Sequence, residues 1–316
     1  MVFDPSPSEC PICGTQNKFT FLQDFSREER TFSLYECNVC AFQFWQPFQS
    51  PGATWYETRG NNKIQEILKP TITREYHKRI LDLAQKDWKG KKILDVGCGT
   101  GEFLAELQKK GCEVWGIDFD PIAIRVGRKH FLLKNLYAMP INKFFEATPL
   151  PIFDCITCFE VIEHVDNPKQ LLLNLVAHIK PAGKIFLSTP SRERMGAHLN
   201  GWDYPPNHLS RWNEKAIMNV CKLSGLKVLS ITYIEQFRIL LESMNAKFHT
   251  GLVRRGANSS QGSPSLNSRR IKTRILYVLG TIKVYILGGI PAFCLWIYGM
   301  RRGKKNGGMF IELALE

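Results

Sequence analysis

The loop Gly97-Cys98-Gly99-Thr100-Gly101 joins an apolar, strand-like run to a helical pattern. Glycines at alternate positions let the backbone turn sharply and place a helix N-terminus beside whatever the loop approaches. The alternation of strand-like and helical segments continues through residues 91–235. Strands separated by helices favour a mostly parallel sheet with helices on both faces. We therefore expect an α/β fold.

Hydrophobic patterning assigns the elements of this expected sheet. The expected strands are Lys92–Gly97, Glu113–Asp118, Phe153–Phe159, Lys184–Thr189 and Leu226–Tyr233. The expected helices are Ile72–Trp88, Glu102–Lys110, a helix that opens at Pro121, Asn167–Ile179 and Asn213–Leu223. Proline supports the start at Pro121, because the N–H that it lacks has no partner at the first helical position.

The 316 residues divide into five segments by composition, which suits one large domain plus a small one. Residues 1–50 form a cysteine-containing, zinc-ribbon-like module, and residues 51–90 form a helical connector. Residues 91–235 form the core. Residues 236–306 form a basic and apolar insertion, and residues 307–316 form the last core strand.

Four cysteines form two Cys-x-x-Cys pairs, Cys10 with Cys13 and Cys37 with Cys40. Each turn of this kind points both thiolates at one ion, and two of them provide the tetrahedral four-sulfur site that Zn²⁺ prefers. The matched spacing argues against a redox pair or four buried thiols. Such a site has no open position for water, so we expect a structural zinc that supplies folding energy to a small module.

Three motifs in order, ILDVGCGTG, VWGIDFDP and FDCITCFEVIEHVDNP, resemble those of the class I S-adenosylmethionine-dependent methyltransferases. The resemblance covers about residues 72–235. It implies a Rossmann-like, seven-stranded, mostly parallel sheet and S-adenosyl-L-methionine as the methyl donor. It also implies an antiparallel last strand inserted beside the sixth, for which Met309–Leu315 is the candidate.

The resemblance assigns roles to the residues at the strand ends. Asp95 would orient the amino group of the donor, Asp118 would hold its ribose hydroxyls, and Glu160 would also lie at the donor site. Three glycines would line the methionine part of the donor. These are Gly97, Gly99 and Gly101.

Glu160, Glu163 and His164 follow the expected fourth strand, and ligands bind at the carboxyl ends of parallel strands. Three roles stay open for this cluster. It can hold Mg²⁺ or a similar ion that polarises an acceptor hydroxyl. His164 can act as a general base, or the cluster can cap the following helix. The motif is similar to one in ubiquinone-pathway and small-RNA O-methyltransferases, where it resembles a metal site.

The segment Trp202–Trp212 follows the expected fifth strand and reads WDYPPNHLSRW. It looks like a loop found in methyltransferases of glycan and secondary-metabolite pathways. Aromatic rings in such a loop can stack on sugar or ring faces, and His208 can take a proton from the acceptor. The alternative is a packed loop in which His208 bonds to the backbone.

Ile275–Met300 is apolar except for Lys283, and basic residues flank it on both sides. Its length allows one membrane span. Because basic residues favour the cytoplasmic side, and because the last strand must return to the core, we expect a hairpin that docks on the membrane through residues 269–305. A single span and a soluble lid or dimer contact are the alternatives. The start of the chain lacks the pattern of a secretory signal, which favours a cytoplasmic enzyme attached to the membrane.

These features predict an S-adenosylmethionine-dependent O-methyltransferase that acts on a glycan, a lipid-linked saccharide or another small membrane-associated metabolite. One alternative is C-methylation of a nucleotide sugar. Another is RNA 2′-O-methylation, although the apolar run between the basic clusters argues against nucleic acid. The third is a membrane-tethered binding module with a non-catalytic methyltransferase fold.

Overall fold

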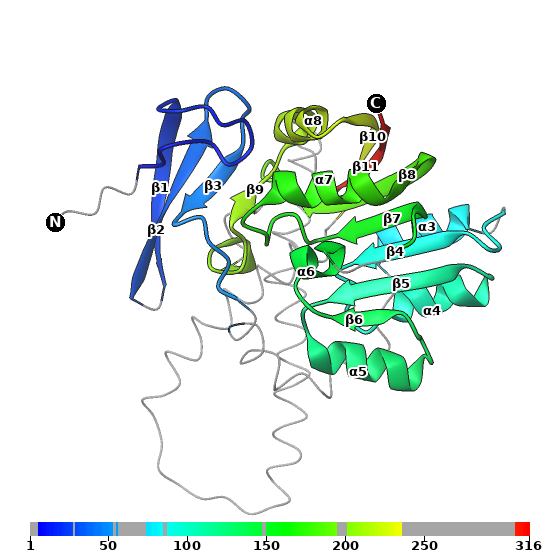
Figure 1. Ribbon diagram of the computed structural model, residues 1–316. Coiled ribbons are helices and arrows are strands. Elements are labelled where there is room, and N and C mark those ends of the chain that lie inside the picture. Colours follow the sequence, from blue (N-terminus) through cyan, green and yellow to red (C-terminus); the bar gives the residue numbers. More distant parts are fainter. Residues whose placement is uncertain are drawn as a thin grey trace, which may run out of the picture. The chain divides into compact units, whose positions relative to one another are not determined.

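The computed structural model describes residues 6–27, 29–52, 55, 74–84, 87–146, 150–194, 201–235 and 307–316 (Figure 1). The chain divides into two compact units, and nearly all described residues belong to the unit made of residues 1–192, 202–234 and 308–316. The apolar segment Ile275–Met300 and its basic flanks lie outside the described residues. Among the residues that are described, no helix is long and apolar enough to cross a membrane.

A seven-stranded sheet forms the centre of the first unit, in the order β10-β11-β8-β7-β4-β5-β6. The strands are β4 (Lys92–Val96), β5 (Glu113–Asp118), β6 (Leu136–Ala138), β7 (Phe153–Phe159), β8 (Ile179–Pro190), β10 (Leu226–Glu235) and β11 (Gly307–Leu315). Strands β4 to β8 pair in parallel. Strand β11 runs antiparallel to β8 and lies between β8 and β10, which confirms the expected inserted last strand.

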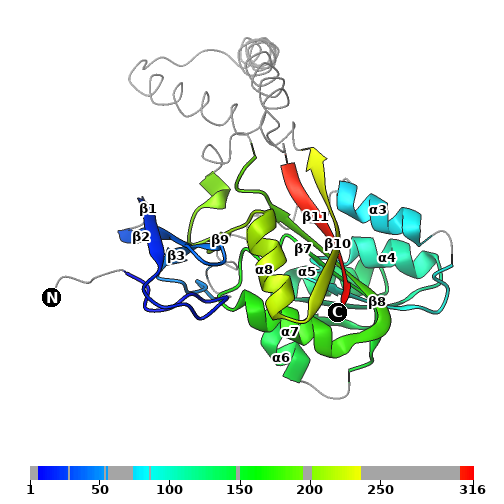
Figure 2. The same cartoon turned by 90° about the horizontal axis from the view of Figure 1, so that it is seen from above.

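Helices cover both faces of this sheet, as expected. They are α3 (Glu75–Leu83), α4 (Glu102–Lys109), α5 (Pro121–His130), α6 (Ile141–Glu146), α7 (Pro168–His178) and α8 (Glu214–Leu223). Neighbouring residues of β4 belong to two separate apolar clusters. Ile93 packs in the cluster that includes α3, α4 and α5, and Leu94 packs in the cluster that includes α6, α7 and α8. Figure 2 shows α3 and α4 on one side of the sheet and α7 and α8 on the other.

Local chemistry sets where the helices begin. Asn167 and Asn213 lie one residue before α7 and α8, and their side chains accept the N–H groups of Gln170 and Ala216. Asparagine is favoured at this capping position because its side chain satisfies a backbone donor that has no partner within the helix. The helices expected to begin at Asn167 and Asn213 therefore included these capping residues. Strand β6 and helix α6 were not expected, because both are short.

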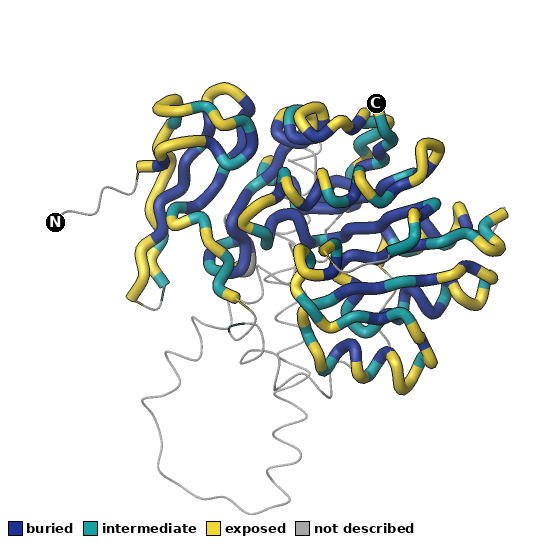
Figure 3. Tube along the Cα trace, in the orientation of Figure 1, coloured by how far each residue is buried: buried dark blue, intermediate teal, exposed yellow. Residues whose placement is uncertain are grey.

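A second, four-stranded sheet has the order β1-β2-β3-β9. Its strands are β1 (Phe19–Arg27), β2 (Arg30–Cys37), β3 (Gln43–Gln46) and β9 (Ser210–Arg211). The first three come from the cysteine-containing module, whereas β9 comes from the loop that follows the fifth strand of the core. Figure 3 shows that β1 is exposed along much of its length, while the central strands β4 and β7 are buried.

Candidate functional site

The glycine loop after β4 packs against core side chains at two of its glycines and faces open space at the third. Gly97 has a φ of +79°, and a Cβ atom there would lie 2.4 Å from Val161 Cγ2. Gly101 has a φ of +75°, and its Cβ would lie 2.7 Å from Leu133 Cδ1. Gly99 has a φ of +54° and faces open space, since no atom lies within 4 Å of its Cβ position. The loop thus exposes backbone at the start of α4, as a ligand cradle requires.

Asp118 ends β5 next to this cradle. Its Oδ2 accepts the N–H of Gly99 at 2.9 Å, and its Oδ1 accepts the N–H of Asp120 at 2.9 Å. Burial raises the pKa of Asp118, and the two backbone bonds oppose that rise. A carboxylate held by both oxygens presents its other lone pairs in fixed directions, which suits the two hydroxyls of a ribose.

Asp95 lies deeper, inside the sheet. Its side chain is 4% exposed, and Oδ1 accepts the hydroxyl of Thr157 at 2.6 Å. Burial raises the pKa of Asp95 to about 7, although the bond from Thr157 opposes that change. The described contacts of Asp95 therefore link β4 to β7. Its expected role toward the donor's amino group stays a prediction.

Glu160 follows β7 with a φ of +56°, a conformation that is uncommon for residues other than glycine. Its N–H donates to Ser188 O at 3.0 Å, and its Oε1 accepts the hydroxyl of Ser188 at 2.9 Å. Arg74, just before α3, bonds to the hydroxyl of Tyr76. Desolvation lowers the pKa of Arg74, whereas its contact with Tyr76 and the charge of Glu160 raise it. The net effect is a raised pKa. Sequence reasoning missed Arg74, because no motif surrounds it.

The structure brings Glu163, His164 and His208 together. One potential ligand atom from each lies within 4.8 Å of the others, and Glu160 is not part of this group. Glu163 is 1% exposed, and its Oε2 accepts the hydroxyl of Thr189 at 3.1 Å. Its Oε1 has no hydrogen-bond partner among the described residues. Burial, and next the charge of Glu160, raise the pKa of Glu163 far above its usual range, so the neutral acid is favoured unless a cation lies beside it.

The two imidazoles meet at right angles, with ring centroids 4.6 Å apart. His164 Nδ1 lies 2.7 Å from the carbonyl oxygen of Asn207. A carbonyl can only accept, so Nδ1 carries the proton and the ring's lone pair is on Nε2. Burial lowers the pKa of His164, which keeps this ring neutral near pH 7. His208 Nδ1 faces Asp203 Oδ1 at 3.7 Å.

Backbone bonds explain why residues so far apart in the sequence meet here. Leu209 donates its N–H to Glu163 O at 2.8 Å and accepts the N–H of Trp45 at 2.9 Å. Strand β9 then pairs with β3, with Ser210 opposite Phe44. The His208 loop is therefore held on one side by the Glu163 turn and on the other by the module.

Two aromatic residues of this loop, Tyr204 and Trp212, pack against rings of the module. Trp212 is fully buried and lies against Phe42, with ring centroids 4.7 Å apart. Tyr204 contacts Phe25 and Trp45 at centroid distances of 4.6 and 5.7 Å. The expectation that loop aromatics stack on a sugar ring is therefore wrong for Trp212, because its faces are covered by the module.

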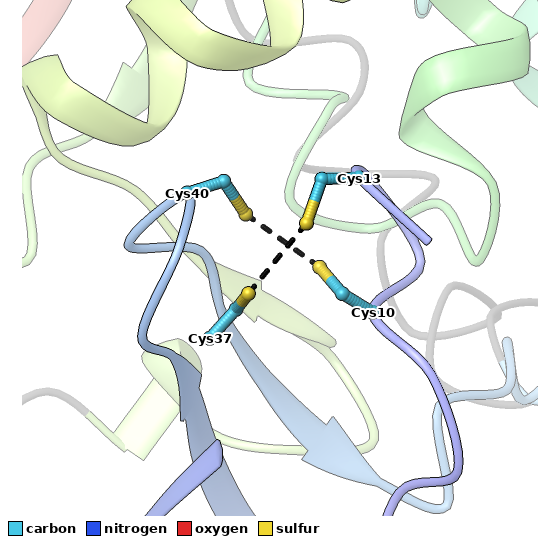
Figure 4. A group of neighbouring side chains, drawn as sticks. All are labelled: Cys10, Cys13, Cys37 and Cys40. Atoms are coloured by element: carbon cyan, nitrogen blue, oxygen red, sulfur yellow. Dashed lines mark hydrogen bonds between the residues drawn. The ribbon is translucent and has the colours of Figure 1, made fainter. Parts of the chain in front are cut away.

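The four cysteines of the module converge as their spacing predicts (Figure 4). The Sγ atoms of Cys10 and Cys40 lie 3.5 Å apart, and those of Cys13 and Cys37 lie 3.6 Å apart. Zinc–sulfur bonds of about 2.3 Å in a tetrahedron place sulfur atoms about 3.8 Å apart, so the quartet fits one zinc ion. The hydrogen bond between the thiols of Cys10 and Cys40 lowers the pKa of Cys10 and raises the pKa of Cys40, so Cys10 is the thiolate of this pair before any metal binds.

Each cysteine turn also contacts the core or closes on itself. Gly14 and Ala41 have positive φ angles and donate their N–H groups to the carbonyls of Cys10 and Cys37. The second turn is tied to the core, since Asn219 Nδ2 donates to Cys40 O at 3.2 Å and Arg192 Nη1 donates to Ala41 O at 2.7 Å. The module and the core therefore share contacts at the cysteine quartet.

Comparison with known proteins gives one family and several relatives. A family model described as a methyltransferase domain matches residues 67–231. A mitochondrial ubiquinone biosynthesis O-methyltransferase of Schizosaccharomyces pombe is 34% identical over 153 residues, which cover 46% of this chain and 54% of that protein. The chain thus spans about half of this relative's length. A ubiquinone biosynthesis O-methyltransferase of Coxiella burnetii is 29% identical over 212 residues, which cover 59% of this chain and 82% of the relative.

Solved structures that match part of this chain include a TehB-like S-adenosylmethionine-dependent methyltransferase from Corynebacterium glutamicum. It has a TM-score of 0.40 and 20% identity, and the match covers 57% of this chain and 86% of that one. An N-methyltransferase from Bradyrhizobium japonicum, solved with S-adenosyl-L-homocysteine, has a TM-score of 0.44 and 18% identity, with coverage of 58% and 89%.

Proposed function

We propose that this chain, which belongs to the methyltransferase domain family, methylates a hydroxyl oxygen of a small-molecule acceptor. The premise is that it is an S-adenosylmethionine-dependent methyltransferase. The observation that carries the proposal is the cluster of Glu163, His164 and His208 at the carboxyl end of β7. A hydroxyl is a weak nucleophile until its proton is removed, and the cluster offers a neutral imidazole for that purpose.

The donor site follows from the residues that fit it. The backbone of Gly97, Gly99 and Gly101 would lie against the methionine part, and Asp118 would accept the ribose hydroxyls. When bound, S-adenosylmethionine supplies an activated methyl group on a sulfonium ion. The protein's own task is then to orient the acceptor oxygen in line with that group and to take its proton.

The cluster supports two ways of taking that proton. In the first, Nε2 of His164 or His208 accepts it directly. Asn207 O holds the His164 ring by Nδ1, and Asp203 faces Nδ1 of His208 at 3.7 Å. In the second, Glu163, His164 and His208 hold a divalent cation such as Mg²⁺. A histidine whose other nitrogen donates to a carbonyl is typical of metal ligands, and the Oε1 atom of Glu163 fits as a ligand. Such an ion would polarise the acceptor hydroxyl and lower its pKa.

Glycans and lipid-linked saccharides are narrower proposals within this class, as is attachment to a membrane through residues 269–305. Their support is the sequence pattern of the apolar and basic segment, which lies outside the described residues. The relatives from S. pombe and C. burnetii are named for ubiquinone biosynthesis. Both are O-methyltransferases by name, which supports oxygen as the methylated atom.

The test is transfer of labelled methyl from S-adenosylmethionine into lipid extract, soluble metabolites and RNA, each with EDTA or with added Mg²⁺. We expect label in a lipid or metabolite pool as a methyl ether, which survives mild alkali. The His164→Ala variant should give label at least about 100-fold more slowly. Label in RNA alone, or equal labelling by the wild type and this variant, would refute the proposal. Loss of transfer with EDTA and recovery with Mg²⁺ would select the cation mechanism.

A further inference from the structure

A cavity of about 290 Å³ opens at the end of the β1–β2 hairpin, and it shares no lining residue with the Glu163 cluster. Its lining residues come from the hairpin, from the segment after β3 and from the loop that carries His208. They are Arg27, Arg30, Phe32, Pro51, Trp55 and Pro206. The two charged side chains of this lining are both arginines, and the other walls are aromatic rings and prolines. The cavity therefore combines positive charge with flat apolar surface.

The two arginines are placed together by the strand register. Arg27 and Arg30 are partners across the hairpin, and Phe25 is the partner of Phe32 on the same face. Like charges directly opposite each other destabilise a strand pair, so an anion bound beside these two arginines would stabilise it. Glu29 lies in the turn with a φ of +63° and does not line the cavity. Among the described lining residues, the charged groups are positive.

The residues that line the cavity contact the loop that carries His208. Arg27 Nη1 donates to the carbonyl oxygen of Pro205 at 3.4 Å, and Phe25 packs on Tyr204 with centroids 4.6 Å apart. Pro206 lines the cavity and precedes His208 by two residues, a separation of about 7 Å at most between their α-carbons. The loop that lines the cavity at Pro206 therefore also carries His208 of the cluster.

We propose that this cavity binds a phosphate or diphosphate group carried by the methyl acceptor, and this inference rests on the proposed function. Two guanidinium groups match the charge of a dianion, and their planar donor sets suit phosphate oxygens. The rings of Phe32 and Trp55 would contact the apolar or ring part of the acceptor next to its phosphate. The zinc-ribbon-like module is then an acceptor-binding part of the enzyme as well as a support for the His208 loop.

The first experiment measures binding of inorganic pyrophosphate to the full chain by titration calorimetry. We expect saturable binding by the wild type, a dissociation constant raised at least about tenfold in Arg27→Gln/Arg30→Gln, and little change in Arg125→Gln/Lys129→Gln. The latter pair loses the same charge from another basic cavity, on α5. Should the first double variant unfold, the single Arg30→Gln variant, whose side chain is exposed, replaces it.

Absence of saturable binding by the wild type would overturn the proposal, as would equal weakening in both double variants. S-adenosyl-L-homocysteine binding, measured in parallel, separates this inference from the proposed function. If donor binding and methyl transfer persist while pyrophosphate neither binds nor inhibits transfer, only the anion site is refuted. If pyrophosphate binds through the two arginines but no hydroxyl is methylated, the anion site stands and the proposed reaction falls.

Discussion

The Nδ1 atom of His164 lies 2.7 Å from the main-chain oxygen of Asn207, one residue before His208. This contact joins the turn after β7 to the loop after β8, and it determines the tautomer of the His164 ring. Because Nδ1 must donate to the carbonyl, the basic lone pair is on Nε2. The two histidines are thus positioned by one segment of backbone.

Replacing either histidine should impair turnover more than donor binding. We expect His164→Ala and His208→Ala to lower kcat by about 100-fold or more, because a positioned base contributes about 100-fold to 10,000-fold. The affinity for S-adenosyl-L-homocysteine should change by less than about threefold, a difference of well under 1 kcal/mol. Steady-state kinetics and calorimetry measure the two quantities, and His130→Ala on the exposed end of α5 is the control. Unchanged kcat in both variants would exclude the cluster from the chemistry.

Replacing Asp118 should have the opposite effect and weaken donor binding. Asp118→Ala removes the carboxylate that Gly99 and Asp120 hold in place, and with it the two hydrogen bonds that the ribose hydroxyls would donate to that carboxylate. Each such bond contributes about 1.5–3 kcal/mol, so we expect a loss of affinity of about 100-fold or more for S-adenosyl-L-homocysteine. The exposed Asp87→Ala variant should bind as the wild type does. Unaltered affinity of Asp118→Ala would remove this residue from the donor site.

Asp95 should make the stability of the donor-free protein depend on pH. Burial raises its pKa from 3.8 to about 7, so the folded state keeps this proton where the unfolded state has lost it. Its contribution to stability is therefore full below about pH 4 and declines as the pH rises toward 7. Asp95→Asn removes that dependence. Relative to the wild type, this variant should become more stable between pH 5 and pH 8, as urea unfolding at both values would show. A constant difference would contradict the assignment.

The cysteine quartet should bind one zinc ion per chain. We expect Cys40→Ser to lose the metal and to lower the free energy of unfolding by about 2 kcal/mol or more, because metal binding supplies folding energy to a small module. Cys112→Ala, which lies in the core outside the quartet, should keep its zinc. Metal analysis and denaturant unfolding measure both effects. Full zinc content in Cys40→Ser would show that the metal is held elsewhere.

The sequence predicted the main sheet well because its signals are local. The run Phe153–Phe159 was assigned with the observed bounds, since a mostly apolar run of this length is typical of a buried strand. The spacing of Cys10, Cys13, Cys37 and Cys40 likewise predicted that their four thiols converge. Short elements such as β6, with three residues, carry too few positions for a periodic pattern.

The candidate site was predicted only in part, because its contacts are not local. Glu163 and His164 were identified from a motif, and His208 from a separate loop, but no pattern showed that they meet. Their meeting depends on the backbone bond from Leu209 to Glu163. The pairing of β3 with β9 was missed for the same reason, since β9 has only two residues and neither is apolar.

The pairing of β3 with β9 also decides how this protein can be rebuilt. A chimera that exchanged residues 1–50 alone would leave Ser210 and Arg211 facing a foreign strand, and it would strip Trp212 of the ring that covers it. A transplant that takes residues 201–212 together with the module keeps both contacts. The two segments that must be exchanged together, residues 1–50 and 201–212, are therefore far apart in the gene. Recombination at a single crossover point between them would separate them.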